Sequence, residues 1–195
     1  MEFYEVVEKR RTIRIFKKGA SEEQLRRIIS AGAKAPSAGG RQPWELIMID
    51  DPEVIDRLAE IKYQLNRTIL PQEGEGQRDV EEKALSQKEW FRDASFVAVC
   101  SQAVRAHPSE RQIKVSHNIS SVWLCVENMS LAAVAEGLGS NIISFWGRQK
   151  EEAERVLGLP EGYELLTIMK FGEPGEEGAP RRWRPESSFL HRNRF

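Results

Sequence analysis

The residues best suited to chemistry form a basic segment near the N-terminus, Arg10-Arg11-Thr12-Ile13-Arg14. In an extended chain, successive side chains point to opposite faces, so Arg10, Thr12 and Arg14 would share one face. Arginine makes planar, paired hydrogen bonds to phosphate oxygens, and a threonine hydroxyl adds a short donor. The segment is therefore a candidate phosphate clamp. A solvated basic strand accounts for the same residues equally well, and both interpretations stay open at this point.

A second candidate is the loop Ala35-Pro36-Ser37-Ala38-Gly39-Gly40-Arg41-Gln42-Pro43-Trp44. Pro36 disfavours a helical conformation at the residue before it, so a preceding helix should end there. Gly39 and Gly40 lack the Cβ atoms that would keep a ligand away from the main chain. Such a stiffened polar loop suits a flat ligand with polar edges. Taken alone, an ordinary helix-to-strand connection is the favoured interpretation.

Composition restricts the possible partners. The chain has 195 residues with 29 Lys plus Arg and 30 Asp plus Glu, a net charge of -1. This balance gives no overall attraction to nucleic acid or to an anionic membrane. No apolar run approaches the length of a membrane span, and the N-terminus lacks the basic start and apolar centre of a signal peptide. Cys100 and Cys125 lie in apolar segments and are expected to be buried, reduced thiols. We therefore expect one cytoplasmic domain over residues 1–195.

Several kinds of chemistry lack their usual residue patterns. The three histidines are scattered, and no C-x-x-C or H-x-x-x-H pair occurs, so no metal site is expected. No G-x-S-x-G motif marks a serine nucleophile. The glycine-rich G-x-G-x-x-G and G-x-x-x-x-G-K-[ST] turns of dinucleotide and nucleotide sites are also missing. We therefore name no catalytic side chain.

The elements that must position these residues alternate along the chain. Ser21-Glu22-Glu23-Gln24 is a capping box that begins a helix. Apolar spacing predicts helices and strands. The expected helices cover about 2–9, 21–34, 51–64, 115–138 and a short stretch ending near 157, and the expected strands cover 45–49, 95–100, 141–146 and 165–172. This order predicts an α+β fold with one sheet and a long buried helix across it.

Three segments suggest features beyond a simple core. The helix expected over 115–138 is apolar nearly all round, so it should be enclosed in the core or between subunits. Residues 66–93 form an excursion that is partly helical towards its end, either a lid over a site or a variable surface loop. The C-terminal tail from Pro180 is basic and has little to pack against, so we expect it to lie on another subunit. Residues 103–113 are expected to be a polar connection.

The whole set of motifs resembles the FMN-dependent nitroreductase family. These motifs are R-R-[ST]-x-R-x-F, A-P-S-x-x-x-x-Q-P-W, a helix ending in E-G-L-G-S, the turn G-L-P-E-G-Y and the strand end K-F-G-x-P. The resemblance runs from Tyr4 to Phe195 and is weakest over 66–93. It implies a nitroreductase-like central mixed sheet flanked by helices. It also implies a homodimer that exchanges its C-terminal tail and binds FMN at the subunit interface.

The resemblance also implies which residues contact FMN. The first group would hold the phosphate and the polar edge of the flavin, and comprises Arg10, Arg11, Thr12 and Arg14. The second would approach the flavin from the other subunit, and comprises Pro36, Ser37, Ala38 and Gly40. Many members have Asn where this chain has Gly40, so a side-chain contact to the ring is expected to be missing.

Three further groups complete the implied cofactor site. The backbone of Ile143, Ser144 and Phe145 would face the reactive N5 atom of the flavin, and Phe145 would add bulk where many relatives have glycine. Arg182 and Arg184 would close on the phosphate from the tail. Asn66 would match an asparagine that contacts the ring.

The implied activity is hydride transfer from NADH or NADPH through FMN to a small acceptor such as a nitroaromatic compound or a quinone, with ping-pong kinetics. NADH and NADPH stay equal alternatives. Other readings are a flavin enzyme of the same fold that performs reductive dehalogenation or flavin destruction, or a flavin-binding protein with little turnover. A nucleic-acid module built on the arginine clusters is disfavoured, because the charge is balanced and stacking aromatic residues are not interleaved.

Overall fold

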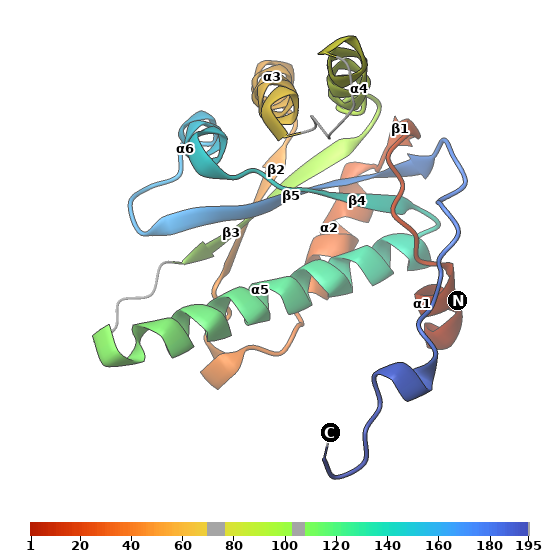
Figure 1. The fold of residues 1–195 in the computed structure, drawn as a ribbon, viewed down its shortest axis with the longest axis vertical. Coiled ribbons are helices and arrows are strands. Elements are labelled where there is room, and N and C mark those ends of the chain that lie inside the picture. The colour runs from red at the N-terminus through yellow and green to blue at the C-terminus, as the bar shows by residue number, and fades with distance from the viewer. Residues whose placement is uncertain (70–76, 103–107, 195) are drawn as a thin grey trace.

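The computed structural model describes residues 1–69, 77–102 and 108–194, and it arranges them as a sheet covered by helices on both faces (Figure 1). The helices are α1 (Phe3–Lys9), α2 (Glu22–Gly32), α3 (Pro52–Ile69), α4 (Gln77–Glu89), α5 (Pro108–Ala135) and α6 (Gly147–Val156). The strands are β1 (Phe16–Gly19), β2 (Trp44–Ile49), β3 (Ser95–Gln102), β4 (Gly139–Ile143) and β5 (Tyr163–Pro174). The expected α+β class is confirmed.

Strand β5 organises the sheet, because it pairs with β1, β3 and β4, while β2 pairs with β3. All of these ladders are antiparallel. Among the described residues, a parallel component comes from the isolated bridge between Thr12 and Ser140. This bridge fixes the basic segment against the start of β4, since Ile13 N–H donates to the Ser140 carbonyl at 3.0 Å.

Both faces of the sheet are buried, as the continuous apolar run in β3 predicts. Val97 and Val99 pack with α2 and α5 in one cluster, whereas Phe96 and Ala98 pack with α3 and α6 in another. The period of two along the strand produces this division. Cys100 and Cys125 are buried and free, as expected.

Helix α5 is the long helix that the sequence predicts, although it begins earlier than expected. Residues 108–113 form its first turns, so the predicted polar connection is wrong for them, and residues 103–107 lie outside the described residues. One flank of α5 is buried through Val122 and Met129, while Trp123 and Leu124 on another flank are 39% and 46% exposed. The helix therefore has an apolar flank that this chain does not cover.

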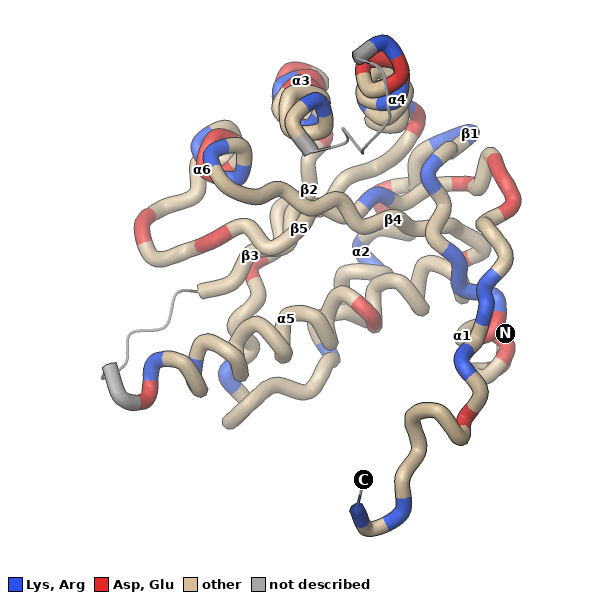
Figure 2. The backbone as a smooth tube through the Cα atoms, viewed as in Figure 1, with Lys and Arg blue, Asp and Glu red and all other residues tan. Residues whose placement is uncertain are grey.

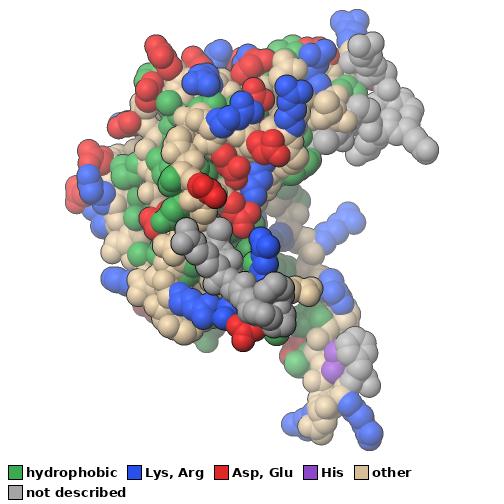
Figure 3. Space-filling model, turned by 90° about the vertical axis from the view of Figure 1, so that its left-hand side faces the viewer, with side chains coloured by type: hydrophobic (Ala, Val, Ile, Leu, Met, Phe, Trp, Pro, Cys, Tyr) green, Lys and Arg blue, Asp and Glu red, His purple; other side chains and the backbone are tan. Residues whose placement is uncertain are grey.

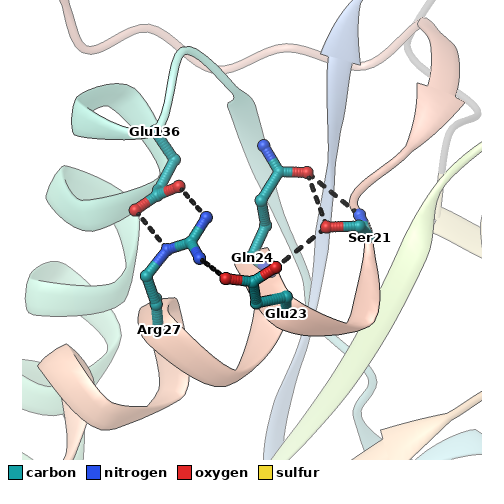
Figure 4. A network of polar contacts seen from close by, with 5 residues as sticks. All are labelled: Ser21, Glu23, Gln24, Arg27 and Glu136. Atoms are coloured by element: carbon teal, nitrogen blue, oxygen red, sulfur yellow. Dashed lines mark hydrogen bonds and ion pairs between the residues drawn. The ribbon is translucent and has the colours of Figure 1, made fainter.

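Helix α2 begins at the predicted capping box and is tied to α5 on the surface (Figure 4). Ser21 Oγ accepts from Gln24 N–H at 3.2 Å, and Gln24 Oε1 accepts from Ser21 N–H at 3.1 Å. Arg27 donates to both carboxylate oxygens of Glu136, just after α5, at 2.8 and 2.7 Å. These bonds lower the pKa of Glu136 below its usual value. The contact aligns the two helices that cover one face of the sheet.

The excursion is largely a second helix beside α3. Helix α3 continues to Ile69, beyond the predicted end near 64, and α4 lies alongside it. Lys88 Nζ donates to Glu60 at 2.6 Å, and Asn66 donates to Gln87 at 2.6 Å. Residues 70–76 lie outside the described residues. These polar contacts across the helix pair explain why the segment is helical despite its many charges.

After β5 the chain passes beside the basic N-terminal segment and then leaves the body. Gly175 N–H donates to the Ile15 carbonyl at 2.9 Å, and Ile15 N–H donates to Glu176 at 3.2 Å. Beyond this point the tail projects as a separate arm, with a hollow between arm and body (Figure 3). Trp183, Phe189 and Leu190 on this arm are more than half exposed. Among the described residues, no helix is both long and apolar enough to span a bilayer.

Candidate functional site

A cavity of about 640 Å³ opens on the α3 and α4 side of the sheet, next to β4. Its walls are Thr12, Arg14, Lys62, Gln87, Trp90, Phe91, Asn141, Ile142, Ile143, Ser144, Trp146 and Lys170. The N-terminal segment, α3, the end of the α4 excursion, β4 and β5 each contribute to it. Its volume is in the range of small-molecule sites.

The cavity carries positive charge without a carboxylate in its lining. Arg14, Lys62 and Lys170 contribute the cations, and the other polar side chains on the wall are neutral. Arg14 also lies over the Trp90 ring, with its Cζ atom 5.8 Å from the ring centroid. Because the lining has cations and no carboxylate, the cavity favours an anionic ligand.

Lys170 stands within the buried strand β5 and is only 1% exposed. Its Nζ donates to the Trp90 carbonyl at 2.6 Å and to the Arg14 carbonyl at 3.0 Å, and lies 5.2 Å from the centre of the Phe16 ring. Burial lowers the pKa of Lys170 to about 7, while Glu176 acts to raise it and Arg14 to lower it. The residue thus places a titratable amine at the cavity wall and holds two loops in position.

Lys62 reaches the cavity from α3. Its Nζ donates to the Ser144 carbonyl at 2.9 Å and lies 5.0 Å from the centre of the Trp146 ring. Burial lowers the pKa of Lys62 to about 8. The contact fixes the backbone that follows β4, where the chain leaves the sheet.

These two lysines predict that the stability of the protein without a bound ligand depends on pH. Their folded pKa values, about 7 and about 8, lie below that of lysine in an unfolded chain. Between roughly pH 7 and 10 the unfolded chain therefore binds more protons, and the free energy of unfolding rises with pH by up to about 1.4 kcal/mol per pH unit for each lysine. Below this window both states are protonated and the full cost of burying the charges remains.

Urea unfolding at several pH values tests this expectation. The slope of the free energy of unfolding against pH should be smaller in Lys170→Met than in the natural chain. Lys150→Met is the matched control, because Lys150 is paired with Glu164 at 2.8 Å outside the cavity. Equal slopes in the natural chain and Lys170→Met would show that Lys170 titrates normally.

The structure brings four of the predicted site residues together on the cavity wall, namely Thr12, Arg14, Ile143 and Ser144. The expected alternation of the basic segment holds in part, because Ile13 is buried whereas Ile15 is 50% exposed. Arg10 and Arg11 do not line this cavity. The Arg11 guanidinium donates to the carbonyl oxygens of Glu8 and Arg10, at 2.5 and 2.8 Å.

Arg10 instead lies close to the start of the tail. Burial, followed by the charge of Arg181, lowers the pKa of Arg10 below its usual value. Figure 2 shows the Lys and Arg residues of the N-terminal segment alongside those of the first part of the tail. Arg182 and Arg184 are exposed on this arm, and Arg184 Nε donates to Ser188 Oγ at 3.1 Å. The two basic segments that the sequence singles out are therefore neighbours.

Two predicted site residues point elsewhere. Phe145 is 5% exposed and packs in the cluster beneath α3 and α6, so its bulk fills the core and not the cavity. Asn66 is 1% exposed and donates to Gln87, which itself lines the cavity. In this chain Asn66 supports a wall residue and does not form the wall.

The predicted Gly-Pro loop lies on the other side of the sheet. Pro36, Ser37, Ala38 and Gly40 lie beneath α5, whereas the cavity opens towards α3 and α4 (Figure 1). Ala38 N–H donates to Ser121 Oγ of α5 at 3.2 Å. Gly39 and Gly40 have φ angles of 62° and 65°, a left-handed conformation that explains the glycines. One chain alone does not bring this loop to the cavity.

Sequence reasoning missed several wall residues, including Lys62, Gln87, Asn141 and Lys170. A signal existed for Lys170, which interrupts the apolar run Leu165-Leu166-Thr167-Ile168-Met169 before Phe171. A charged residue in a strand buried on both faces requires specific partners or a functional site. Trp90, at the end of the excursion over 66–93, also lines the cavity. The described residues contain no group of three potential metal ligands.

The fold and the cavity together define an α+β protein with a cation-lined cavity beside β4 of a helix-covered antiparallel sheet. The chain matches the model of the Nitroreductase family over residues 7–173 and belongs to that family.

The chain is also similar to individual proteins. The NADH dehydrogenase of Thermus thermophilus is 26% identical over 196 residues, with 88% of this chain and 86% of the relative covered. An iodotyrosine deiodinase of Thermotoga neapolitana is 25% identical over 176 residues, with 89% of each chain covered. The solved structure of the NADPH:FMN oxidoreductase from Vibrio harveyi, complexed with NAD⁺, superimposes with a TM-score of 0.77 at 22% identity, covering 99% of this chain and 77% of that one.

Proposed function

We propose that the protein is an FMN-dependent oxidoreductase that passes hydride from NADH or NADPH to a small acceptor such as a nitroaromatic compound or a quinone. The observation that carries the proposal is a carboxylate-free cavity with three cations beside Ile143 and Ser144, in a member of the Nitroreductase family. The volume of the cavity, its cations and its apolar wall residues Trp90 and Ile142 support FMN as the ligand. FMN, when bound, supplies a ring that accepts and returns a hydride.

The residues on the wall have distinct roles in this proposal. Arg14 and Thr12 hold the polar edge of the ring, and Lys62 fixes the main chain at Ser144 that faces it. Arg10 and the tail cations Arg182 and Arg184 hold the phosphate. Because hydride transfer between stacked rings needs no side-chain acid or base, position and charge are what the protein contributes.

The proposal includes a homodimer with exchanged tails. The loop at 36–40 and the cavity lie on opposite sides of one chain, so a second copy must supply the loop to the ring. Apolar side chains on α5 and on the tail are exposed in one chain, including Trp123 and Trp183. Large exposed apolar side chains of this kind are typical of subunit interfaces. We also propose that the excursion over 66–93 acts as a lid over the cavity, since Gln87 and Trp90 from this segment line it.

Reductive dehalogenation is a second candidate, favoured by the similarity to an iodotyrosine deiodinase over most of the chain. The two candidates differ in the acceptor that reoxidises the reduced protein. Anaerobic mixing of NAD(P)H-reduced protein with a nitroaromatic, a quinone and a halogenated phenol distinguishes them. Release of halide with recovery of oxidised flavin absorbance would favour the second candidate.

The absorption spectrum of the purified protein is the first test. We expect a yellow protein with flavin absorbance that NADH or NADPH bleaches without oxygen, because the cavity would retain FMN through several charge-assisted hydrogen bonds. Parallel anaerobic titrations with the two nucleotides identify the donor. Colourless protein that does not take up added FMN would refute the proposal, and flavin that neither nucleotide bleaches would indicate a flavin-binding protein with little turnover.

A further inference from the structure

The Lys170 amine has two carbonyl partners. Its third position on nitrogen holds a lone pair when the amine is neutral and a hydrogen when it is protonated. Its Nζ donates one hydrogen to the Arg14 carbonyl and one to the Trp90 carbonyl. A neutral amine has two hydrogens and a lone pair, whereas an ammonium group has three hydrogens and no lone pair. Both states therefore satisfy the two carbonyls. Protonation replaces the lone pair by a third hydrogen, and Lys170 is one of the residues that line the cavity.

The charged groups around Lys170 do not fix its protonation state, so a charged ligand in the cavity can change it. Glu176 acts on the amine from beyond β5, but its Oε1 atom already accepts from the N–H groups of Arg14 and Ile15. The Arg14 charge opposes protonation, and Lys62 of α3 lines the same cavity. Burial lowers the pKa of Lys170 to about 7, so near neutral pH a small change in local charge changes its protonation.

We propose that Lys170 couples proton uptake to the appearance of negative charge in the cavity, so that reduction of bound FMN draws a proton from solvent onto the Lys170 amine. This inference rests on the proposed function. NAD(P)H would deliver a hydride, equivalent to two electrons and one proton, to the bound ligand. The nucleotide would then leave as NAD(P)⁺. The negative charge that remains on the ligand is balanced when the Lys170 lone pair takes a second proton from solvent. Return of hydride to the acceptor reverses the change and releases that proton.

The midpoint potential of bound FMN against pH tests this coupling. Each proton taken up with two electrons changes the equilibrium tenfold per pH unit, which is about 30 mV. Between roughly pH 7.5 and 9, above the pKa of Lys170 in the empty cavity, proton uptake by Lys170 should add about 30 mV per pH unit to the slope of the natural chain. Lys170→Arg keeps a permanent charge and Lys170→Met has none, so both should lose this added slope and keep whatever Lys62 on the same wall contributes.

Controls separate this inference from the proposed function. Lys150→Met, outside the cavity, should keep the slope of the natural chain. If Lys170→Met folds poorly because two carbonyls lose their donor, Lys170→Arg and calorimetric proton uptake in the natural chain decide the question. A steep slope retained in both variants, or a shallow slope in the natural chain, would overturn the role of Lys170 alone. Failure of the natural chain to bind FMN would overturn the proposed function as well.

Discussion

Replacing Arg14 by glutamine is expected to weaken FMN binding by about 10- to 100-fold, the equivalent of about 1.5–3 kcal/mol for a charge-assisted hydrogen bond. The Arg14 side chain lines the cavity and lies over Trp90, whereas its carbonyl accepts from Lys170. The substitution removes the charge and leaves that carbonyl in place. Adding Arg10→Gln should weaken binding further, since Arg10 is proposed to hold the phosphate. Quenching of FMN fluorescence during titration of the apoprotein measures both effects.

Arg26→Gln is the matched control for these variants. Arg26 is exposed on α2 and paired with Glu22 at 2.7 Å, away from the cavity. It should bind FMN like the natural chain. An Arg14→Gln variant with unchanged FMN affinity would show that the cavity, although cationic, is not where the polar edge of FMN lies.

Deleting residues 180–195 is expected to convert a dimer into a monomer and to weaken FMN binding by at least about 100-fold. The deletion removes the exposed apolar residues Trp183, Phe189 and Leu190, which are proposed to lie on the second subunit. It also removes the two tail cations proposed to hold the phosphate, each contributing about 1.5–3 kcal/mol. Light scattering gives the mass in solution, and fluorescence titration gives the FMN affinity.

A double substitution separates the two contributions of the tail. Arg182→Gln with Arg184→Gln in the full chain should weaken FMN binding but leave the dimer intact. The deletion should not unfold the body, because residues 181–194 are exposed and lie on the arm that projects from it. A truncated protein that remains dimeric and binds FMN normally would refute the exchanged tail.

Local signals account for most of what the sequence predicted correctly. The capping box at Ser21 begins α2, and Asp51 accepts from Glu53 N–H at 2.9 Å at the start of α3. Such caps involve atoms within three residues of one another, so their sequence pattern is sufficient. The ends of helices were predicted less well. Helix α3 continues past residue 64 because α4 packs against it, and that contact has no local pattern.

The site shows the same division. Thr12 and Arg14 were recognisable because arginine and hydroxyl residues alternate over a short segment. The alternation could not show that Arg10 lies near Arg181 and away from the cavity, because Arg181 belongs to a tail that is far away in sequence. The Phe145 side chain was expected to add bulk at the ring, yet the chain leaves β4 at Ile143 and turns this side chain into the core. A backbone match between relatives does not determine where a substituted side chain points.

By itself, the sequence determined the α+β class, the basic segment, the family resemblance and the residues of the Gly-Pro loop. These depend on residue types at short spacing, which the covalent chain preserves. Only the tertiary structure decided that Lys62 of α3 and Lys170 of β5 meet at one cavity, that Asn66 supports its wall, and that the loop lies on the opposite side of the sheet. Those placements come from the packing of segments far apart in sequence, where burial and charge act through space.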